Sequence, residues 1–351
     1  MKKRILITPL DWGLGHATRC ISIIRLLLDK GHEVCIATSG LALPLLKQEF
    51  PHLSFFELPS YQARYSATLP LMMKVFLQSP YFLRVIQQEH TIIEKLVAEQ
   101  GIDVILSDNR YGCYSQKAKS IFITHQLTLQ MPTGLRWLQG LVNYFNHRLI
   151  RKFEVCWVPD FRTNPITGAL THTTDVEVTF IGMLSRFHKR EVSAPKKYDL
   201  LVLLSGPEPQ RSLLEKLVLQ QVKEYTGKVL LVRGLPNTNE TLADVENVNH
   251  LSSHELQAAL EASSLVLARS GYTTIMDLYF LEKKAIFIPT PGQTEQEYLA
   301  KQLSERDIAF SMKQEEFDLI KALEASKSFK GFSRSVHPAS EEPLSDLLSG
   351  L

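Results

Sequence analysis

The sequence contains only four cysteines, and they are far apart in the chain. They are Cys20, Cys35, Cys113 and Cys156. They form no C-x-x-C pair and have no cluster of histidines around them. This spacing argues against a disulfide framework and against a structural metal site, and it fits a reducing compartment. We therefore expect a cytoplasmic protein without a structural metal.

Long apolar runs are also missing. No segment reaches the roughly 18 consecutive apolar residues that a membrane-spanning helix needs. The run after the basic N-terminus, Ile5 to Leu10, is interrupted by Thr8 and Pro9 and stops at Asp11. It is too short for the apolar region of a signal peptide and predicts a first strand instead.

Neither sign of charge predominates over the whole chain, whose formal net charge is +2. The first half differs, because residues 1–150 contain 16 Lys and Arg against 10 Asp and Glu, an excess of 6. This excess favours an anionic partner or surface. We do not expect that partner to be a nucleic acid.

What the sequence does contain is a regular alternation of short apolar runs with helix-like segments. In the first half the runs are Arg4–Thr8, Glu33–Thr38, Leu53–Leu58, Val104–Ser107, Ile121–Thr124, Val155–Val158 and Val176–Ile181. In the second half they are Leu200–Leu204, Val229–Val232, Leu265–Leu267 and Ala285–Ile288. This alternation predicts an α/β fold with mostly parallel sheets.

The alternation is interrupted by a polar, basic stretch between Met183 and Lys197. We therefore predict a Rossmann-like N-terminal domain over residues 1–185, a linker over 186–198 and a Rossmann-like C-terminal domain over 199–351. A central cleft between two such domains is the expected place for a site. The residues from His337 onward predict a tail or a short closing helix.

The first glycine-rich turn, Gly13-Leu14-Gly15-His16, follows the first predicted strand. A dinucleotide fingerprint would need a third glycine, but residue 18 is Thr. The turn instead favours a pocket of backbone N–H groups at a helix N-terminus, with His16 as a base or a hydrogen-bond donor. The alternative is an ordinary tight turn into a helix.

The corresponding turn of the second half is Ser205-Gly206-Pro207. Free N–H groups and the helix dipole at such a turn suit a phosphate. Arg211 could add a charge-assisted contact. The alternative is a plain turn with a proline at the start of a helix.

The most informative stretch, Leu265 to Gln302, predicts two successive strand–turn–helix units. Polar residues follow both strand ends: Ser270, Thr273, Thr274 and Asp277 around Gly271, and Gln296 and Glu297 behind the second turn. Ligands of α/β proteins bind at the carboxyl ends of strands, and these groups can hydrogen-bond the hydroxyls of a ribose or a sugar. Alternatively, Thr274 and Asp277 have the spacing of a capping box, in which Asp277 only caps its own helix.

Over roughly residues 4–305 the chain resembles the two-domain GT-B glycosyltransferases, and most closely the family 28 enzymes that add N-acetylglucosamine to a lipid-linked muramyl-pentapeptide. Gly271, Thr274 and Asp277 fit the family signature S/A-G-x-x-T-x-x-E, with Asp in place of Glu. The resemblance implies that this acid binds the ribose and that the N-terminus of its helix holds the diphosphate.

The resemblance assigns further roles on both sides of the reaction. Ser205 and Gly206 would lie in the loop that wraps the nucleotide-sugar, and Gln296 with Glu297 would contact the donor hexose. Gly13, Gly15 and His16 would face the acceptor. The first turn has the sequence DWGLGH where the peptidoglycan enzyme has GGTGGH, and Glu297 replaces a Gln. The acceptor and the hexose therefore stay open.

Together these features predict metal-independent, inverting transfer of a hexose, N-acetylglucosamine or a related sugar, from a UDP-sugar to a hydroxyl acceptor. No convincing DxD-type carboxylate pair follows a strand, so the backbone N–H groups and helix dipole at Ser270-Gly271 would stabilise the leaving diphosphate. The only small molecule expected besides the acceptor is the UDP-sugar co-substrate.

His16 is the predicted general base, because histidine side chains titrate near neutral pH. Asp108, at the end of a predicted strand, is the alternative base, and Asp11 and His125 are weaker candidates. The residues expected on the acceptor side are Asp11, Gly13, Gly15, Asn109, Arg110, His125 and Gln126.

Two other functions fit parts of the pattern. A non-hydrolysing UDP-sugar 2-epimerase would use the same architecture and donor without an acceptor. The G-x-G turn alone would also suit a nucleotide-binding module or a NAD-dependent oxidoreductase.

Two segments, Leu69–Ile86 and Leu135–Lys152, combine bulky apolar and aromatic residues with basic ones. The basic residues are Lys74, Arg84, Arg136, Arg148, Arg151 and Lys152. A basic amphipathic helix can lie in a membrane interface, which would suit a lipid-linked acceptor at the inner face of the membrane. The alternative is a helix packed on the sheet with a solvated basic edge.

Overall fold

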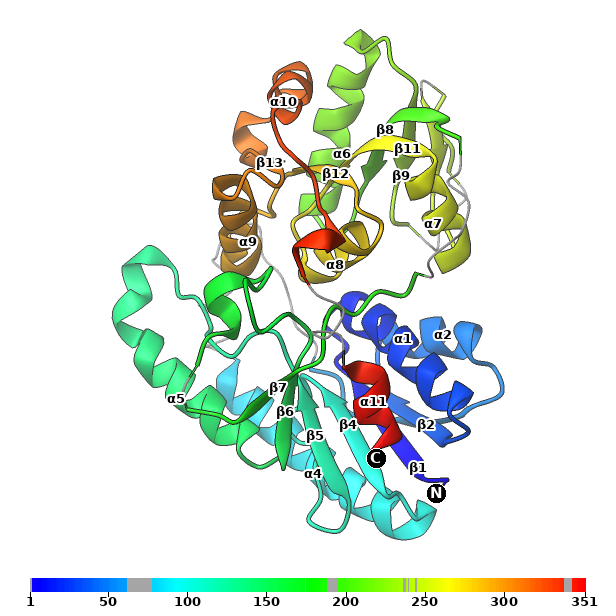
Figure 1. Ribbon diagram of the computed structural model, residues 1–351, viewed down its shortest axis with the longest axis vertical. Helices are drawn as coiled ribbons and strands as arrows, with labels where there is room; N and C mark the ends of the chain where they lie inside the picture. The colour runs from blue at the N-terminus through cyan, green and yellow to red at the C-terminus, as the bar shows by residue number, and fades with distance from the viewer. Residues whose placement is uncertain are drawn as a thin grey trace. The chain divides into compact units, whose positions relative to one another are not determined.

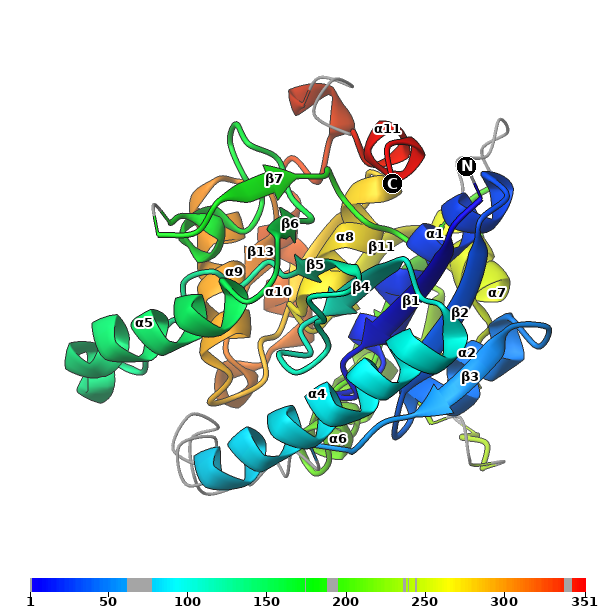
Figure 2. The same cartoon turned by 90° about the horizontal axis from the view of Figure 1, so that it is seen from below.

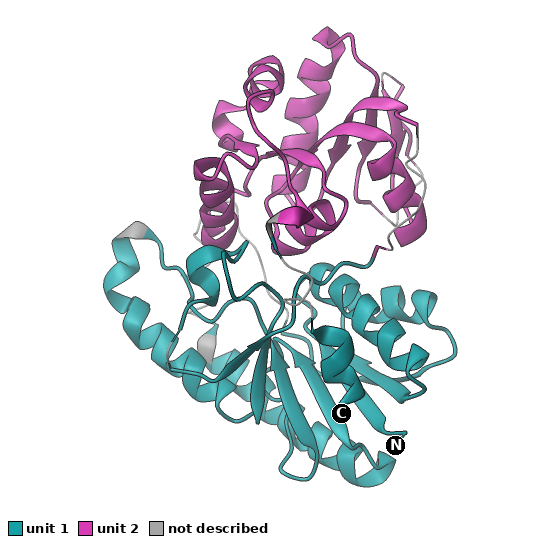
Figure 3. Ribbon diagram, in the orientation of Figure 1, with its two compact units in different colours: residues 1–64, 72–186, 337–351 teal, residues 65–71, 187–336 magenta. Residues whose placement is uncertain are grey.

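The computed structural model describes residues 2–61, 78–173, 175–187, 195–235, 238, 240–243, 245–337 and 343–351. These residues divide into two units (Figure 3). The first contains the described residues up to 186 and those from 337 onward, and the second contains those from 187 to 336.

The first unit is built around a parallel sheet (Figure 1). Its strands are β1 (Arg4–Pro9), β2 (Glu33–Thr38), β3 (Ser54–Glu57), β4 (Val104–Asp108), β5 (Lys119–Ile123), β6 (Val155–Val158) and β7 (Val178–Phe180). Its helices are α1 (Gly15–Asp29), α2 (Ala42–Glu49), α4 (Ser79–Gln100), η1 (Thr133–Leu138), α5 (Gln139–Ile150), η2 (Gly168–Thr171) and α11 (Leu344–Ser349). The strand order is β3-β2-β1-β4-β5-β6-β7.

Successive side chains of β1 point to opposite faces of the sheet, and different helices cover the two faces. Ile5 and Ile7 join a core that includes side chains of α1, α2 and α11. Leu6, which points to the other face, joins a core with Ile93 and Leu96 of α4. Both α4 and α5 lie on this second side (Figure 2). Strands buried on both faces account for the nearly continuous apolar runs in the sequence.

The second unit repeats this design with a six-stranded parallel sheet in the order β10-β9-β8-β11-β12-β13. Its strands are β8 (Tyr198–Leu203), β9 (Val229–Val232), β10 (Glu246–Val248), β11 (Ser263–Ala268), β12 (Lys284–Phe287) and β13 (Phe310–Ser311). Its helices are α6 (Gln210–Gln221), η3 (Val222–Glu224), α7 (Ser253–Glu261), α8 (Tyr272–Phe280), α9 (Thr294–Glu305), η4 (Gln314–Glu316), α10 (Leu319–Ser326) and η5 (Arg334–Val336).

The two faces of the second sheet are again covered by different helices. Ile286 of β12 shares a core with side chains of α6 and α10. Phe287, the next residue, contacts Phe332, which in turn contacts Tyr279 of α8. The prediction of parallel α/β sheets is therefore confirmed in both halves.

The C-terminal residues differ from the predicted domain division. The second domain was predicted to run to residue 351, but the described residues from 337 onward belong to the first unit. Leu344, Leu348 and Leu351 enter the core that α1 forms with the first sheet, so the end of the chain is a packed helix rather than a tail. Most of the predicted linker, residues 188–194, lies outside the described residues.

Candidate active site

Each sheet contains one pair of adjacent strands whose following connections run in opposite directions along the sheet. In the first unit this pair is β1 and β4, and in the second it is β8 and β11. The loops that leave such a pair diverge, which opens a crevice at the carboxyl ends of the strands. Most of the predicted site residues lie in the loops at these two positions or in the helices that follow them.

The turn after β1 leads directly into α1. Gly13 has φ +77°, a left-handed conformation that favours glycine, and α1 begins at Gly15. His16 is therefore the second residue of the helix and remains partly exposed, with 16% of its side chain accessible. The turn places His16 close to the end of β4.

Asp108, the last residue of β4, lies next to His16. Its Oδ1 is 3.2 Å from His16 Nδ1, and the carboxyl group is fully buried. The two predicted candidates for the base thus form one dyad, in which a carboxylate can orient the imidazole ring.

A third residue, Arg19, completes this group and was missed from the sequence. Its Nε donates to Asp108 Oδ2 at 2.7 Å, and its second terminal nitrogen donates to Asp108 Oδ1. Burial alone would raise the pKa of Asp108, but Arg19 and His16 hold it well below its usual range. A charged residue on the buried face of the α1 pattern, between Ala17 and Ile21, was the available signal.

Two further buried side chains border the group. The Arg19 guanidinium lies 3.0 Å from Nδ1 of His125, a predicted weaker base that follows β5. The Cys20 thiol donates to Asp108 Oδ2 at 3.5 Å. Burial and the Asp108 carboxylate raise the pKa of this thiol, so it stays protonated. His16, Asp108 and His125 are therefore brought together, although 109 positions separate the first from the last in the sequence.

Arg110 does not face this group. Its guanidinium is fully buried and donates to Glu89 Oε1 at 2.6 Å, to Ser39 Oγ at 2.6 Å and to the backbone oxygens of Pro9 and Pro59. It ties the loops after three strands together. A sequence reveals an arginine at a strand end but not the distant glutamate that pairs with it.

The remaining predicted acceptor-side residues lie in the same loops. Asp11 accepts a hydrogen bond from Ser60 and lies 3.4 Å from the Arg110 guanidinium. Asn109 has φ +58°, and its backbone N–H donates to the Ile123 oxygen. The Gln126 N–H donates to Thr124 Oγ1 at 3.0 Å, and the residue is half-buried.

In the second unit the loops after β8, β11 and β12 converge. Gly206 has φ +103°, and a Cβ added to it would lie 3.7 Å from Thr290 Oγ1 in the loop after β12. Ser270 Oγ donates to the backbone oxygen of Gln296 at 2.8 Å, which joins the loop after β11 to α9. The three strands are adjacent in the sheet, and their loops form one surface.

Gln296 is fixed on this surface from both ends of its side chain. Its Oε1 accepts the Thr290 N–H at 2.9 Å, and its Nε2 donates to Gln293 Oε1 at 2.6 Å. A Cβ on Gly271 would lie 3.9 Å from Gln296 Nε2. Glu297 is exposed, and its Oε1 accepts the Gly292 N–H at 2.9 Å.

Helix α8 begins three residues earlier than the capping box would require. Its N-cap is Gly271, with no side-chain cap, and its first residue is Tyr272. Thr274 is therefore inside the helix and Asp277 one turn further on, so the capping-box alternative is wrong. Thr273 and Thr274 are half-buried in the first turn, and Asp277 is buried.

Arg211 lies on α6 but does not point a free guanidinium at the turn. It donates to Glu208 at 2.6 Å, to Glu215 at 3.2 Å, to Ser212 and to the Arg233 backbone oxygen. Like Arg110, it is held in a buried polar network rather than presented to a ligand.

Arg269, which precedes Ser270, was not predicted as a site residue. It is 1% exposed, and within the described ranges its partners are the oxygens of Ile288, Pro289, Gln210 and Gln314, none of them a carboxylate. Burial lowers the pKa of Arg269 to about 10, so the side chain is still charged at neutral pH. A buried positive charge thus lies behind the turn after β11.

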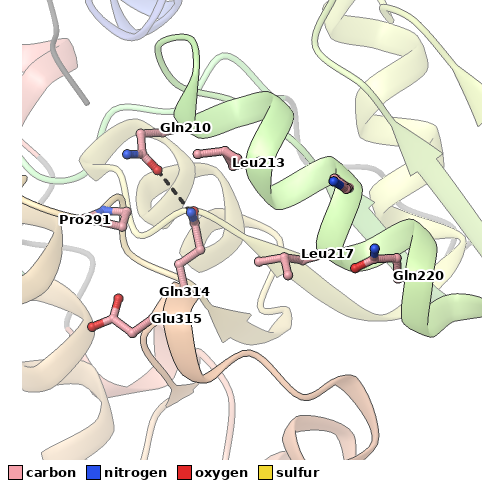
Figure 4. A pocket seen from close by; sticks show the side chains of 8 residues that line it. Gln210, Leu213, Leu217, Gln220, Pro291, Gln314 and Glu315 are labelled. Carbon is pink, nitrogen blue, oxygen red and sulfur yellow. Dashed lines mark hydrogen bonds between the residues drawn. The ribbon is translucent and has the colours of Figure 1, made fainter. Parts of the chain in front are cut away.

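A surface hollow of about 430 Å3 borders this region between α6 and η4 (Figure 4). Gln314 Nε2 donates to Gln210 Oε1 at 3.0 Å across it, and Pro291 of the β12 loop lines one side. Among the described residues no group of three or more His, Cys, Asp or Glu side chains could hold a metal ion. No helix within those residues is long and apolar enough to cross a membrane.

Comparisons with known proteins give the same assignment. Residues 201–346 match the glycosyltransferase family 28 C-terminal domain. Two curated relatives share the name UDP-N-acetylglucosamine--N-acetylmuramyl-(pentapeptide) pyrophosphoryl-undecaprenol N-acetylglucosamine transferase. The protein of Clostridium tetani is 26% identical over 304 residues, which cover 82% of this chain and 78% of the relative. The protein of Glaesserella parasuis is 29% identical over 346 residues, or 92% and 90% of the two chains.

Solved structures extend the match to the whole fold. MurG of Acinetobacter baumannii aligns with a TM-score of 0.61 at 12% identity, and the alignment covers 100% of both chains. The predicted GT-B architecture and transferase class are confirmed, and the matches favour glycosyl transfer over epimerisation. The chain is a GT-B-fold glycosyltransferase that is similar to the family 28 enzymes, and its residues 201–346 match their C-terminal domain.

Proposed function

We propose that the enzyme transfers a hexose, N-acetylglucosamine or a close relative, from a UDP-sugar to a hydroxyl of a lipid-linked acceptor, with inversion and without a metal ion. The observation that carries this proposal is the His16–Asp108 dyad, with Nδ1 and Oδ1 3.2 Å apart at the carboxyl end of β4. The named relatives use the same kind of donor and a lipid-linked acceptor.

The donor is assigned to the surface formed by the loops after β8, β11 and β12. Backbone N–H groups at the start of α8 and the helix dipole suit a diphosphate, and the buried charge of Arg269 behind them adds to the field. Asp277 is proposed to bind the ribose hydroxyls. Gln296 and Glu297, both held by bonds to the β12 loop, are proposed to contact the hexose.

In the proposed step His16 Nε2 takes the proton of the acceptor hydroxyl. The acceptor oxygen then forms a bond to the anomeric carbon from the face opposite the diphosphate. The bond between that carbon and the diphosphate oxygen breaks, and UDP leaves with the electron pair. For this role His16 Nε2 must be unprotonated, so the resting proton must be on Nδ1, where Asp108 Oδ1 accepts it and later stabilises the imidazolium. The Arg19 nitrogen 2.9 Å from the same Nδ1 then makes no hydrogen bond to it and acts on the ring only through its charge.

A membrane-bound acceptor is supported by an apolar stripe on η1 and α5. Trp137 is 78% exposed, and Leu141, Tyr144 and Phe145 are each more than half exposed along the same helical face. Exposed basic residues flank them: Arg136, Arg148, Arg151 and Lys152. The inner side of α5 packs on the sheet through Ile150. We propose that this stripe binds the surface of an anionic membrane. Of the other predicted segment, Leu69–Ile86, residues 69–77 lie outside the described residues.

The test of the base is turnover by His16→Gln. The proposal predicts that release of UDP in the presence of acceptor falls by about 100-fold or more, which is the contribution expected of general-base catalysis. Affinity for UDP should stay unchanged, because the donor residues are in the second unit. His90→Gln is a matched control, since that ring stacks on Tyr114 away from Asp108. Full turnover by His16→Gln would overturn the assignment.

A further inference from the structure

Arg19 is an almost completely buried charged residue next to the proposed base. It is 2% exposed and lies one turn after His16 on α1. Its guanidinium contacts three titratable side chains at once, namely both oxygens of Asp108, His125 Nδ1 at 3.0 Å and His16 Nδ1 at 2.9 Å.

The charges around His16 determine how readily it binds a proton. The titratable and charged side chains that surround it are Arg19 and Cys20 of α1, Asp108 of β4 and, beyond Arg19, His125 after β5. A buried carboxylate alone would favour the imidazolium strongly, because nothing in the interior would screen it. Arg19 places a permanent positive charge on the same carboxylate, and the pair has no net charge.

We propose that Arg19 is a positioning residue that keeps His16 unprotonated, and therefore able to act as a base, near neutral pH. This inference rests on the proposed role of His16. Arg19 acts in two ways: it compensates the Asp108 carboxylate, and its own charge lies 2.9 Å from the ring nitrogen of His16. Asp108 can then orient the ring without making it too basic to function.

The contact with His125 has a related consequence. Arginine has only donors, so His125 Nδ1 must accept the Arg19 hydrogen and the ring proton must be on Nε2. Protonation of His125 at Nδ1 would break this bond and place two positive groups in contact. Arg19 thus disfavours a second proton on both histidines of the group.

The test is the pH dependence of kcat for Arg19→Met, Asp108→Asn and the double variant. In Arg19→Met the midpoint of the acidic limb should move up by about one pH unit or more, because the uncompensated carboxylate retains a proton in the dyad. In Asp108→Asn it should move down. In the double variant, which has neither charge, it should return towards the wild-type value.

Arg25→Met serves as the matched control. Arg25 is on the same helix but pairs with Glu49, so its loss should leave the acidic limb in place. Arg19→Met could fail to fold, because the buried Asp108 carboxylate loses its partner. In that case the double variant and Arg19→Lys are compared with the wild-type enzyme instead. A merely structural Arg19 would lower kcat equally at every pH and would overturn the proposal.

Histidine-selective 15N NMR tests the proposed role of Arg19 separately from the proposed role of His16 as the general base. The His16 ring should titrate at higher pH in Arg19→Met than in the wild-type enzyme, whether or not His16 is the base. If the His16 titration shifts but His16→Gln remains active, the proposed function fails and the electrostatic role of Arg19 stands. If His16→Gln is inactive but Arg19→Met leaves both the titration and the acidic limb unchanged, the role of Arg19 is refuted.

Discussion

The hydroxyl of Thr290 faces the α-carbon of Gly206, since a Cβ built on Gly206 would lie 3.7 Å from Thr290 Oγ1. Thr290 is 2% exposed, and its Oγ1 has no hydrogen-bond partner within the described part of the chain. Buried hydroxyls normally have a partner, and an unsatisfied one costs about 1–3 kcal/mol. Under the proposed function the bound donor supplies that partner.

Thr290→Val should therefore change the stability of the free enzyme and its affinity for the UDP-sugar in different ways. The variant keeps the shape of the side chain and removes the unsatisfied hydroxyl, so the free enzyme should be as stable as wild type or more stable in urea. Its affinity for the UDP-sugar, measured by calorimetry, should fall about tenfold with the loss of one buried hydrogen bond. Thr167→Val is the opposite control, because Thr167 Oγ1 donates to buried Asp160 in the first unit and its loss should lower stability alone. Unchanged donor affinity in Thr290→Val would exclude this contact.

Asp277→Asn tests the proposed ribose contact. A carboxylate that accepts bonds from ribose hydroxyls contributes about 1.5–3 kcal/mol, so UDP should bind about 10- to 100-fold more weakly to the variant. The wild-type enzyme should also prefer UDP over 2′-deoxy-UDP, and Asp277→Asn should lose that preference. Glu305→Gln, an exposed neutralisation on α9, is the control. A variant that still discriminates the two nucleotides would show that Asp277 does not contact the ribose.

The exposed stripe on η1 and α5 predicts binding to anionic vesicles at low salt. Replacing Trp137 and Phe145 by Ser should weaken binding to phosphatidylglycerol vesicles at least tenfold, because two large apolar side chains no longer enter the interface. Leu213→Ser, at a half-exposed leucine of the second unit, should have no effect. The wild-type protein should also be released as ionic strength rises. Absence of wild-type binding at low salt would remove this part of the account.

Lys283 lies at the end of the second sheet opposite the proposed donor site. Its burial predicts that the stability of the protein depends on pH. Burial and the neighbouring Lys196 lower the pKa of Lys283 to about 7 from the ordinary value of 10.5. Between these values the unfolded chain holds a proton that the folded chain has released, so stability should rise as the pH rises from about 7 to 10.5. The urea midpoint of Lys283→Met should lack this rise, while Lys284→Met, at an exposed neighbour, should retain it. A flat wild-type profile would contradict the prediction.

The sequence was most informative where local pattern alone determines structure. The strands Glu33–Thr38, Val155–Val158 and Val229–Val232 have the predicted bounds, because β-branched and apolar runs between turn residues specify them locally. Strands β10 and β13 were missed, since they contain only three and two residues and carry no such run.

The site was less predictable, because charges far apart in the sequence determine it. His16 and Asp108 were predictable, since both follow strands that a parallel sheet brings to one edge. Arg110 and Arg211 have the same sequence signal but are paired with Glu89 and Glu215 in the interior. Arg19 and Thr290 look ordinary in the sequence, and only their buried surroundings show that their polar groups matter.

The central claim is transfer of a hexose from a UDP-sugar to a separate hydroxyl acceptor. The most direct measurement is mass spectrometry and NMR of the products formed from a panel of UDP-hexoses, with and without a lipid extract that contains polyprenyl-linked sugars. The account predicts UDP and a glycosylated lipid with inverted anomeric configuration, formed only when the acceptor is present. Conversion of the UDP-hexose to its epimer without acceptor, with no glycosylated product, would contradict it.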